Sequence, residues 1–375
     1  MPPGAADAFM ARALALAEGA RLACPPNPAV GCVLVSAGGA VIGEGRTQAT
    51  GQAHAEIMAL RDAAARGQAT QGATAYVTLE PCAHQGRTGP CCDALIAAGV
   101  SRVVAALQDP NPSVAGLGFA RLRAAGVEVE VGPGAEAARE LNLGFFSRMR
   151  RGRPWVRMKV AASLDGRTAL PNGASQWITG AAARSDGHAW RARAGAILTG
   201  IGTVLRDDPR LDVRLPDAPR QPLLAIVDSR LRTPADAALW RAARRPVRIY
   251  TAGADAGRAV PLQALGAEVL ALPGADGRVD LPAVLRDLAA CEVNEVHVEA
   301  GAGVNGALWR AGLVDEVLLY QAPLLLGEGA GLAALGPFTE VAQGLRLEYR
   351  EVDRVGPDLR LLARVAERAR FDQAE

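Results

Sequence analysis

The chain has 375 residues, which is longer than a single hydrophobic core usually reaches, so two domains are expected. Half of the residues are hydrophobic and 21% are charged, a composition that excludes an intrinsically disordered chain. The 41 Lys and Arg residues nearly balance the 39 Asp and Glu residues, and only 4% of the residues are aromatic, which argues against a nucleic-acid partner.

No apolar run approaches the roughly 20 residues that a membrane-spanning helix needs, and the first residues lack the pattern of a signal peptide. We therefore expect a cytoplasmic protein without a membrane partner. The six cysteines are too sparse and too unevenly placed for a disulfide framework in a chain of this length. In a reducing compartment, their clustering between Cys82 and Cys92 indicates a metal site.

The first 150 residues alternate between helical and strand-like patterns. An Ala- and Leu-rich helix is predicted over 7–23, and the prolines after Cys24 end it. Two Val- and Ile-rich strands, 29–36 and 41–46, are separated by Gly38-Gly39, which is typical of a hairpin. The other elements predicted in this part are helices at 54–66, 91–98, 119–125 and 135–149 and strands at 74–79, 103–107 and 127–131. This alternation predicts a layered α/β domain.

A basic segment marks the expected domain boundary. Residues 148–154 contain glycine, proline and few apolar side chains, which is typical of a linker, so we divide the chain into domains 1–150 and 151–375. Beyond the boundary, strands are predicted at 155–161, 196–200, 223–228, 247–250, 295–299 and 317–320. Helices fall between several of these strands, so the second domain is also predicted to be α/β.

Three residues of the first domain have the types and the placement of zinc ligands. His54 opens a predicted helix, Cys82 follows a strand, and Cys91 begins the next helix. Helix N-termini lower the pKa of a thiol and favour the thiolate that zinc binds. One imidazole and two thiolates leave the fourth tetrahedral position open for water, as in catalytic zinc sites. The pattern therefore predicts a zinc-dependent hydrolytic enzyme.

Glu56 is predicted to move the protons in this site. Zinc lowers the pKa of its bound water towards neutrality, so the water becomes a nucleophile at pH 7, and a neighbouring carboxylate must transfer the protons. Glu56 lies two residues after His54, in the first turn of the same predicted helix. The combination of His-x-Glu and Pro-Cys is that of nucleobase deaminases.

The spacing of the cysteines leaves alternatives open. Nucleobase deaminases commonly have Cys-x-x-Cys, whereas eight residues separate Cys82 from Cys91, and Cys92 competes as the third ligand. Neighbouring helical residues point about 100° apart, so only one of the pair faces the metal, and we favour Cys91. Alternatively, His54 caps a helix and the cysteines are small buried hydrophobic residues, which suits each residue alone better than the set in this order.

Specific motifs run through both halves of the sequence. In the first half they are Asn27-Pro-Ala-Val-Gly31, His54-Ala-Glu56, Thr78-Leu-Glu-Pro-Cys82, Gly86-Arg-Thr88, Cys91-Cys-Asp-Ala-Leu95 and Gln108-Asp-Pro-Asn-Pro112. In the second half they are Lys159, Ser163-Leu-Asp-Gly-Arg-Thr168, Ser175-Gln-Trp-Ile-Thr179, Asp207-Asp-Pro209, Val227-Asp-Ser229 and Val298-Glu-Ala-Gly301. Through these motifs the chain resembles the family of bifunctional riboflavin-biosynthesis deaminases and reductases, whose members share the long insert between the cysteines.

The resemblance implies a cytidine-deaminase-like three-layer α/β domain followed by a dihydrofolate-reductase-like domain. It implies zinc-dependent deamination of a diaminohydroxyphosphoribosylaminopyrimidine, and then NADPH-dependent reduction of the ribosyl group of 5-amino-6-(5-phosphoribosylamino)uracil to a ribityl chain. The expected partners are therefore small phosphoribosyl pyrimidines, and the chain is expected to form a homo-oligomer.

For the deaminase, the matched positions place Asn27 against the pyrimidine and His84 and Arg87 near the ribose phosphate. A solvated loop charge is the alternative for Arg87. Thr47 departs from the family pattern, because related proteins commonly have a histidine there. Threonine carries no charge, so a phosphate contact at this position would be weaker unless Arg46 replaces it.

For the reductase, the resemblance implies two sets of binding residues. Those matched to NADPH are Ala161, Trp177, Thr203, Asp207, Ser229, Gly301, Ala302, Gly303, Val304, Asn305, Gly306 and Ala307. Those matched to the substrate are Lys159, Ser175, Arg191, Leu211, Arg214 and Glu299. The alternatives are a core position for Trp177 and solvated surface positions for the arginines.

The three glycines at 301, 303 and 306 form a G-x-G-x-x-G pattern, which on its own is a weak dinucleotide-binding signal. The pattern lies near the C-terminus without an obvious acidic residue about 20 positions on, and the related reductases do not share the second glycine, so we interpret it as accidental. The N–H groups at the start of the helix can still bind a pyrophosphate.

Two other functions fit part of the sequence. One is a zinc nucleobase deaminase fused to an unrelated nucleotide-binding domain, although the near-neutral charge opposes a polymeric substrate. The other is a structural zinc protein, but such a site is closed by four ligands and does not need Glu56.

Overall fold

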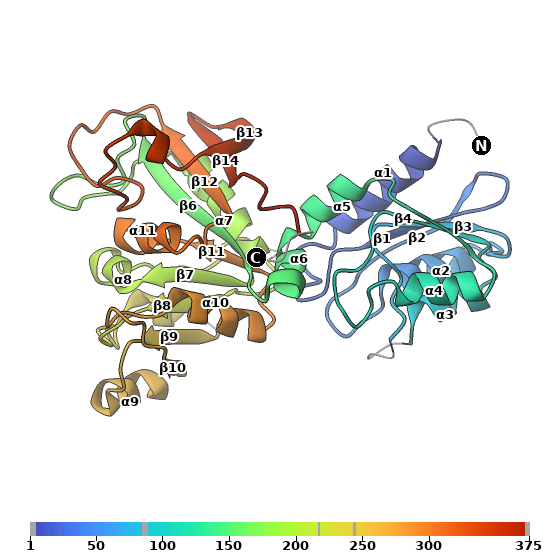
Figure 1. The fold of residues 1–375 in the computed structure, drawn as a ribbon, viewed down its shortest axis with the longest axis horizontal. Helices are drawn as coiled ribbons and strands as arrows, with labels where there is room; N and C mark the ends of the chain where they lie inside the picture. The colour runs from blue at the N-terminus through green and yellow to red at the C-terminus, as the bar shows by residue number, and fades with distance from the viewer. Residues whose placement is uncertain (1–4, 85–88, 217, 243–244, 372–375) are drawn as a thin grey trace. The chain divides into compact units, whose positions relative to one another are not determined.

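The computed structural model describes residues 5–84, 89–216, 218–242 and 245–371, and the chain divides into two compact units (Figure 1). Unit 1 extends to Arg151 and includes Phe371, and unit 2 comprises Gly152–Arg370. No helix within the described ranges is long and apolar enough to cross a membrane.

Unit 1 is built on a mixed five-stranded sheet. Its strands are β1 (Gly31–Val35), β2 (Val41–Arg46), β3 (Thr74–Val77), β4 (Arg102–Ala105) and β5 (Glu128–Val131), in the order β2-β1-β3-β4-β5. β1 pairs antiparallel with β2 and β3, whereas β3, β4 and β5 run parallel. Its helices are α1 (Ala5–Glu18), α2 (Ala55–Ala65), α3 (Cys91–Ala97), α4 (Leu117–Ala124), α5 (Ala135–Leu141) and α6 (Leu143–Arg151).

Two glycines allow helices to approach both faces of this sheet closely. A Cβ at Gly31 would lie 1.9 Å from the carbonyl oxygen of Ala13 in α1, and a Cβ at Gly45 would lie 2.2 Å from that of Ala55 in α2. Both distances are severe clashes, so these positions require glycine. Helices α1 and α5 lie on one face and α2, α3 and α4 on the other (Figure 1). The three-layer fold implied by the resemblance is confirmed.

The helix predicted over 135–149 is two helices, because Asn142 interrupts it. The side chain of Asn142 accepts a hydrogen bond from the Ala29 amide at 2.8 Å and donates to the carbonyl oxygens of Ala29 and Ala138 at 3.0 and 3.2 Å. Asn142 has φ −122° and ψ 20°, which ends α5 before α6 begins at Leu143. A buried asparagine therefore ties this break to the segment that leads into β1.

Unit 2 is built on a nine-stranded sheet in the order β10-β9-β8-β7-β11-β6-β12-β14-β13. The strands are β6 (Trp155–Ser163), β7 (Ala196–Gly200), β8 (Leu223–Val227), β9 (Val247–Thr251), β10 (Ala267–Ala271), β11 (Glu295–Val298), β12 (Glu316–Ala322), β13 (Leu347–Val355) and β14 (Asp358–Val365). The α-helices are α7 (Ala181–Arg193), α8 (Ile201–Asp207), α9 (Ala256–Ala264), α10 (Leu281–Ala290) and α11 (Ala302–Arg310). Two short 3₁₀ helices are η1 (Ala238–Arg241) and η2 (Val341–Gln343).

The seven strands from β10 to β12 are parallel, and only β14 and β13 complete the sheet in antiparallel pairs. A core of buried apolar side chains, among them Met158, Leu198, Leu285 and Val296, fills one face of the central strands. Because the parallel strands share a direction, the segments after β7, β8 and β11 all leave the sheet at the carboxyl ends of the strands, where open α/β sheets bind ligands.

Candidate metal centre and reductase pocket

Unit 1 brings together the three predicted zinc ligands. His54 precedes α2 as its N-cap residue, Cys82 follows β3, and Cys91 is the first residue of α3. The Nδ1 atom of His54 lies 3.5 Å from Cys82 Sγ and 3.4 Å from Cys91 Sγ, and the three ligand atoms lie within 4.8 Å of one another. Tetrahedral zinc with ordinary bond lengths separates a nitrogen and a sulfur ligand by about 3.6 Å. The donor set therefore fits zinc in type and in spacing.

Cys92 lies beside this cluster but points elsewhere. Its Sγ is 3.8 Å from the Asp93 carboxylate, whereas the adjacent Cys91 contacts His54. The one-residue step along α3 separates the two side chains in the way that helix geometry requires. Of the two alternatives left open by the sequence, the geometry places Cys91 at the cluster.

The two clustered cysteines share the charge of one thiolate. The Cys91 S–H and its backbone N–H, together with His54, stabilise negative charge on Cys82 and lower the pKa of Cys82 to about 4 against the effect of burial. The pKa of Cys91 is raised, because its S–H donates to the Cys82 thiolate and its side chain is buried. A cation that replaces this shared proton would have two thiolate ligands, as zinc prefers.

Glu56 is the buried carboxyl group next to the cluster. Its side chain is 3% exposed, and its Oε2 atom has no hydrogen-bond partner among the described residues. Burial first, and then the neighbouring Cys82 thiolate, raise the pKa of Glu56 to about 7. An oxygen of this kind needs a partner that the described residues do not supply, which fits a water molecule or substrate in the site.

Glu80 is a residue of this site whose role sequence reasoning missed. Its buried carboxylate accepts four backbone N–H groups, from Asp109, Gly116, Gly118 and Phe119, at 2.9 to 3.2 Å. These contacts hold the 109–119 segment, including the Gln108-to-Pro112 motif, against the turn that carries Cys82. Its place in the motif Thr78-Leu-Glu-Pro-Cys82 was the available signal.

The predicted substrate residues of unit 1 lie in different surroundings. Asn27 is in a half-buried turn and His84 is exposed, while Arg87 lies outside the described residues. Thr47 is buried, and its hydroxyl contacts the Val30 backbone, accepting from N–H at 3.2 Å and facing the carbonyl at 3.4 Å. The hydroxyl of Thr47 is therefore engaged within the protein, whereas Arg46 is exposed.

Unit 2 contains a cavity of about 1300 Å³ at the carboxyl ends of β7, β8 and β11. Every predicted cofactor and substrate residue of this unit lines it except Gly306. A Cβ at Gly306 would lie 2.2 Å from the Ala334 carbonyl oxygen, so this glycine permits close packing of α11 against a loop. The cavity thus collects predicted site residues that are up to 148 positions apart in the sequence, from Lys159 to Ala307.

Several cofactor-matched residues belong to two helices, α8 and α11. Thr203 and Asp207 belong to α8, and Gly301 is the N-cap residue of α11. The Ser229 hydroxyl accepts the Val279 N–H at 3.3 Å. Trp177 is 68% exposed, with the Arg184 guanidinium 4.5 Å from the centre of its ring. An exposed indole at a cavity argues against the core alternative for Trp177 and suits stacking on a flat ring.

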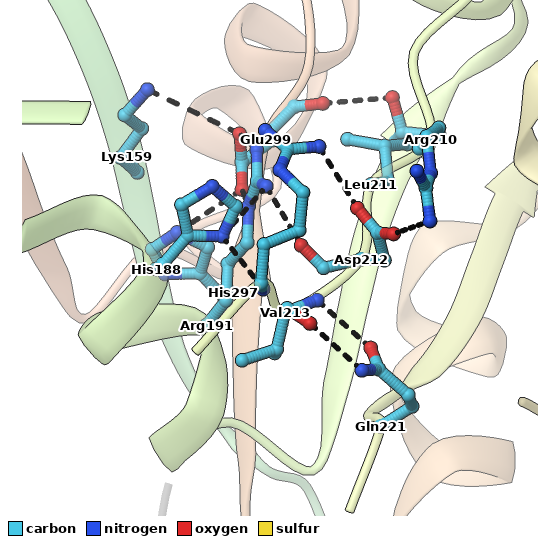
Figure 2. A network of polar contacts seen from close by, with 12 residues as sticks. Lys159, His188, Arg191, Arg210, Leu211, Asp212, Val213, Gln221, His297 and Glu299 are labelled. Atoms are coloured by element: carbon cyan, nitrogen blue, oxygen red, sulfur yellow. Dashed lines mark hydrogen bonds and ion pairs between the residues drawn. The ribbon is translucent and has the colours of Figure 1, made fainter. Parts of the chain in front are cut away.

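Glu299 contacts two other substrate-matched residues, Arg191 and Lys159 (Figure 2). Arg191 binds its carboxylate in a bidentate manner, with one N–O distance of 2.9 Å, and the Lys159 ammonium lies 4.0 Å away. The fully buried His297 ring is 3.5 Å from the same carboxylate. Although partial burial acts in the opposite direction, Arg191 in particular holds the pKa of Glu299 well below its usual range, so the carboxylate is charged at neutral pH.

The neighbouring segment carries further arginines (Figure 2). The buried Asp212 carboxylate binds Arg210 at 2.7 Å and Arg214 at 3.0 Å, one through each oxygen. About half of each of these arginine side chains is exposed. Arg191 is engaged by Glu299 and by the Asp212 carbonyl, so Arg210 and Arg214 are the more accessible cations. Arg210 and Asp212 were not among the predicted site residues.

Comparison with known proteins agrees with both units. Residues 4–107 match the cytidine and deoxycytidylate deaminase zinc-binding region, and residues 154–361 match the RibD C-terminal domain. The riboflavin biosynthesis protein RibD of Escherichia coli is 46% identical over 366 residues, which cover 94% of this chain and 97% of that protein. The RibD of Haemophilus influenzae is 42% identical over 94% of this chain and 95% of its own length.

Solved structures match over the same extent. Acinetobacter baumannii RibD in form 1 has a TM-score of 0.87 and 42% identity, covering 96% of this chain and 98% of that one. A diaminohydroxyphosphoribosylaminopyrimidine deaminase/5-amino-6-(5-phosphoribosylamino)uracil reductase from Thermotoga maritima has a TM-score of 0.86 and 31% identity, with coverage of 96% and 99%.

Proposed function

The chain belongs to the RibD family of riboflavin biosynthesis proteins, and we propose that its two units act in turn on one phosphoribosylated pyrimidine. It is a bifunctional deaminase and reductase of riboflavin biosynthesis. Membership over both halves rules out a deaminase fused to an unrelated nucleotide-binding domain. We assign deamination to residues 1–150 and reduction to residues 151–375.

The proposed first substrate is diaminohydroxyphosphoribosylaminopyrimidine. Zinc, when bound by His54, Cys82 and Cys91, activates water for attack on the ring carbon that bears the amine. Glu56 takes one proton from that water and gives it to the ring nitrogen, and then carries a proton from the new hydroxyl to the departing ammonia. The observation that supports this role is the buried Oε2 atom of Glu56, which has no partner in the described chain.

Asn27, His84 and Arg87 are proposed to bind the substrate of this step. Asn27 has both donors and acceptors for a pyrimidine edge. His84 is exposed in the segment between Cys82 and Cys91, and Arg87 follows it in the sequence, so the long insert supplies groups suited to a ribose phosphate.

The proposed second substrate is 5-amino-6-(5-phosphoribosylamino)uracil. NADPH, when bound, supplies a hydride to the ribosyl C1′. We propose that Trp177 and the N-terminus of α11 hold the nicotinamide cofactor, through stacking and through N–H groups for its pyrophosphate; both line the cavity, which supports this role. Ala161, Thr203, Asp207, Ser229 and residues 301–307 complete the proposed cofactor site.

Lys159, Ser175, Arg191, Leu211, Arg214 and Glu299 are proposed to bind the ribosyl group and its phosphate. Opening of the sugar ring leaves an oxygen that must receive a proton. Burial lowers the pKa of Lys159, although Glu299 opposes this shift, so its ammonium group releases a proton more readily than an exposed lysine does. We propose Lys159 as the donor of this proton.

A direct assay tests the proposed function. Purified protein supplied with zinc, NADPH and the diaminopyrimidine ribosyl phosphate is expected to release ammonia and to lose nicotinamide absorbance at the same time. If the substrate is consumed without either change, the proposed substrate is wrong. A parallel assay with NADH tests the preference for NADPH.

Glu56→Gln tests the division of labour between the units. The variant is expected to retain zinc and to lose ammonia release by at least about 100-fold, because glutamine cannot carry the proton. It should reduce the supplied deaminated intermediate at the wild-type rate. Glu18→Gln, the same chemical change at an exposed position of α1, is the matched control and should keep both activities. Equal loss of both activities in Glu56→Gln would contradict separate sites.

We also propose that the chain forms a homo-oligomer through unit 2. β13 is an edge strand of the nine-stranded sheet, and its described side chains are almost all exposed, including Leu347, Tyr349 and Val352. An exposed edge strand with apolar residues is a surface that proteins usually cover. Apart from further copies of the chain itself, the partners we propose are the small molecules of the two reactions.

A further inference from the structure

His188 lines the cavity of unit 2, but none of the roles proposed above uses it. It lies on α7, and Figure 2 places its ring among the residues around Glu299. Its Nδ1 atom lies 3.3 Å from the backbone nitrogen of Arg214 and 3.5 Å from Nη1 of Arg191. A backbone N–H and a guanidinium can only donate, so Nδ1 must accept, and the proton of the neutral ring is on Nε2.

The surroundings keep the imidazole of His188 neutral. Burial and the positive charges of Arg191 and Arg214 lower the pKa of His188 to about 4, although the carboxylates of Glu299 and Asp212 act in the opposite direction. The protein therefore presents Nε2–H as an uncharged donor with a fixed tautomer.

The donor Nε2–H has no hydrogen-bond acceptor among the residues that the structure describes. Nδ1 is occupied from the protein side, whereas Nε2 belongs to a residue that lines the cavity. A half-buried donor beside a binding cavity is available for a ligand oxygen.

The charged groups near His188 indicate which ligand group would accept its hydrogen bond. Arg214 contacts His188 through its backbone N–H. The guanidinium groups of Arg214 and Arg210 both bind the carboxylate of Asp212. Each guanidinium uses only part of its donors on this carboxylate and is about half exposed. Two accessible guanidinium groups that line the same cavity as this neutral donor suit a dianionic phosphate better than a sugar hydroxyl.

We infer that His188 donates its Nε2–H to a phosphate oxygen of the substrate of the reductase, beside the guanidinium groups of Arg210 and Arg214. This inference rests on the proposed function, because it needs a phosphorylated ribosyl substrate. His188 is then a substrate-binding residue, and Arg210 is a second arginine of the phosphate subsite.

Two variants of His188 distinguish the role of Nδ1 as an acceptor from the role of Nε2 as a donor. In His188→Asn, the amide oxygen takes the place of Nδ1 and still accepts the Arg214 N–H, but the donor at Nε2 is lost. In His188→Gln, the longer amide places an N–H group near the position of Nε2, but the acceptor at Nδ1 is lost. With the full-length enzyme, NADPH oxidation gives KM and kcat for the phosphorylated substrate, and the deaminase activity of each preparation is the control for folding of unit 1.

The expected result is an increase in KM of about tenfold for His188→Asn, with kcat within about twofold of wild type, and a smaller increase for His188→Gln. If His188 only positioned Arg214, the order would be reversed, because His188→Asn would keep the Nδ1 contact and His188→Gln would not. That reversed order would overturn the inference.

The dephosphorylated riboside identifies the oxygen that His188 contacts. His188→Asn should reduce this riboside with the same kcat/KM as wild type, because the partner of Nε2–H is missing in both. Equal losses with the riboside and the phosphorylated substrate would assign His188 to a sugar hydroxyl and overturn the phosphate subsite. Failure of the proposed function is distinguishable, because the wild-type enzyme would then not oxidise NADPH with either compound.

Discussion

At the metal centre, one position along α3 separates a cysteine that contacts His54 from a cysteine that does not. Cys91→Ser is expected to reduce the zinc content from about one equivalent to a small fraction, since the donor set loses one of three ligands. Cys92→Ser should retain zinc, because its sulfur lies towards Asp93. Zinc analysis by atomic absorption after gel filtration checks both variants. Loss of zinc from Cys92→Ser with retention in Cys91→Ser would reverse the assignment.

The two histidines near Glu299 make the stability of unit 2 depend on pH. The pKa of His188 is lowered to about 4 from an ordinary value of 6.5, and burial also lowers the pKa of His297. Between pH 6.5 and 4 these histidines therefore bind more protons in the unfolded chain than in the folded chain. Their contribution to the free energy of unfolding is fully present above pH 6.5 and is lost as the pH falls through this range. Partial exposure of His188 makes its share smaller than the full shift implies.

Tryptophan fluorescence measures this dependence, because all five tryptophans lie between Trp155 and Trp309, within unit 2. The midpoint of urea unfolding should be lower at pH 5 than at pH 7.5. The difference should be smaller in His188→Asn, which does not titrate. An unchanged difference in that variant would show that His188 is not among the groups responsible.

Among the elements, the junction between α5 and α6 depends on a single side chain. Asn142→Ala removes three hydrogen bonds and leaves the backbone N–H and carbonyl of Ala29 without these partners, so unit 1 should lose about 2 kcal/mol of unfolding free energy. Residual deaminase activity in increasing urea reports on unit 1, while tryptophan fluorescence of unit 2 is the internal control. A shift of both transitions together would indicate that the two units unfold as one.

The sequence predicted most buried strands but not the strands at the edges of the second sheet. β7 (Ala196–Gly200) and β8 (Leu223–Val227) are runs of apolar residues, which buried parallel strands require, and their patterns identified them. β13 alternates charged residues such as Glu348 and Arg350 with exposed apolar ones and has no buried face, so hydrophobic periodicity did not reveal it. β10 was missed for the same reason, since only one of its five residues is buried.

Some residues of the candidate site could be predicted from the local sequence, whereas the roles of others depend on contacts between distant segments. His54, Glu56, Cys82 and Cys91 were predictable because each stands at a helix or strand end with a recognisable chemical type. The roles of His188 and Asp212 were not, since they depend on contacts between α7 and the segment that follows α8. No spacing in the sequence encodes such contacts. The break at Asn142 was missed because its partner, Ala29, is 113 residues away.

For the whole molecule, the exposed edge of unit 2 predicts its assembly. Tyr349→Glu combined with Val352→Lys places charges on β13 and should shift a homo-oligomer towards the monomer without unfolding it, because both side chains are exposed. Multi-angle light scattering gives the mass, and tryptophan fluorescence verifies the fold. An oligomer that persists in this variant would place the interface elsewhere; a monomeric wild-type protein would refute the homo-oligomer itself.

The Glu80 carboxylate connects the segment from Asp109 to Phe119 to the turn that carries Cys82, so the two should move together. Four amide protons depend on the two oxygens of one carboxylate, Asp109 and Gly116 on Oε2 and Gly118 and Phe119 on Oε1, so movement of this one side chain would release all four. We therefore expect the segment to open as one cooperative unit. Its hydrogen-exchange rates should be similar at all four amides, and its contacts with the turn that carries Cys82 should form or break together.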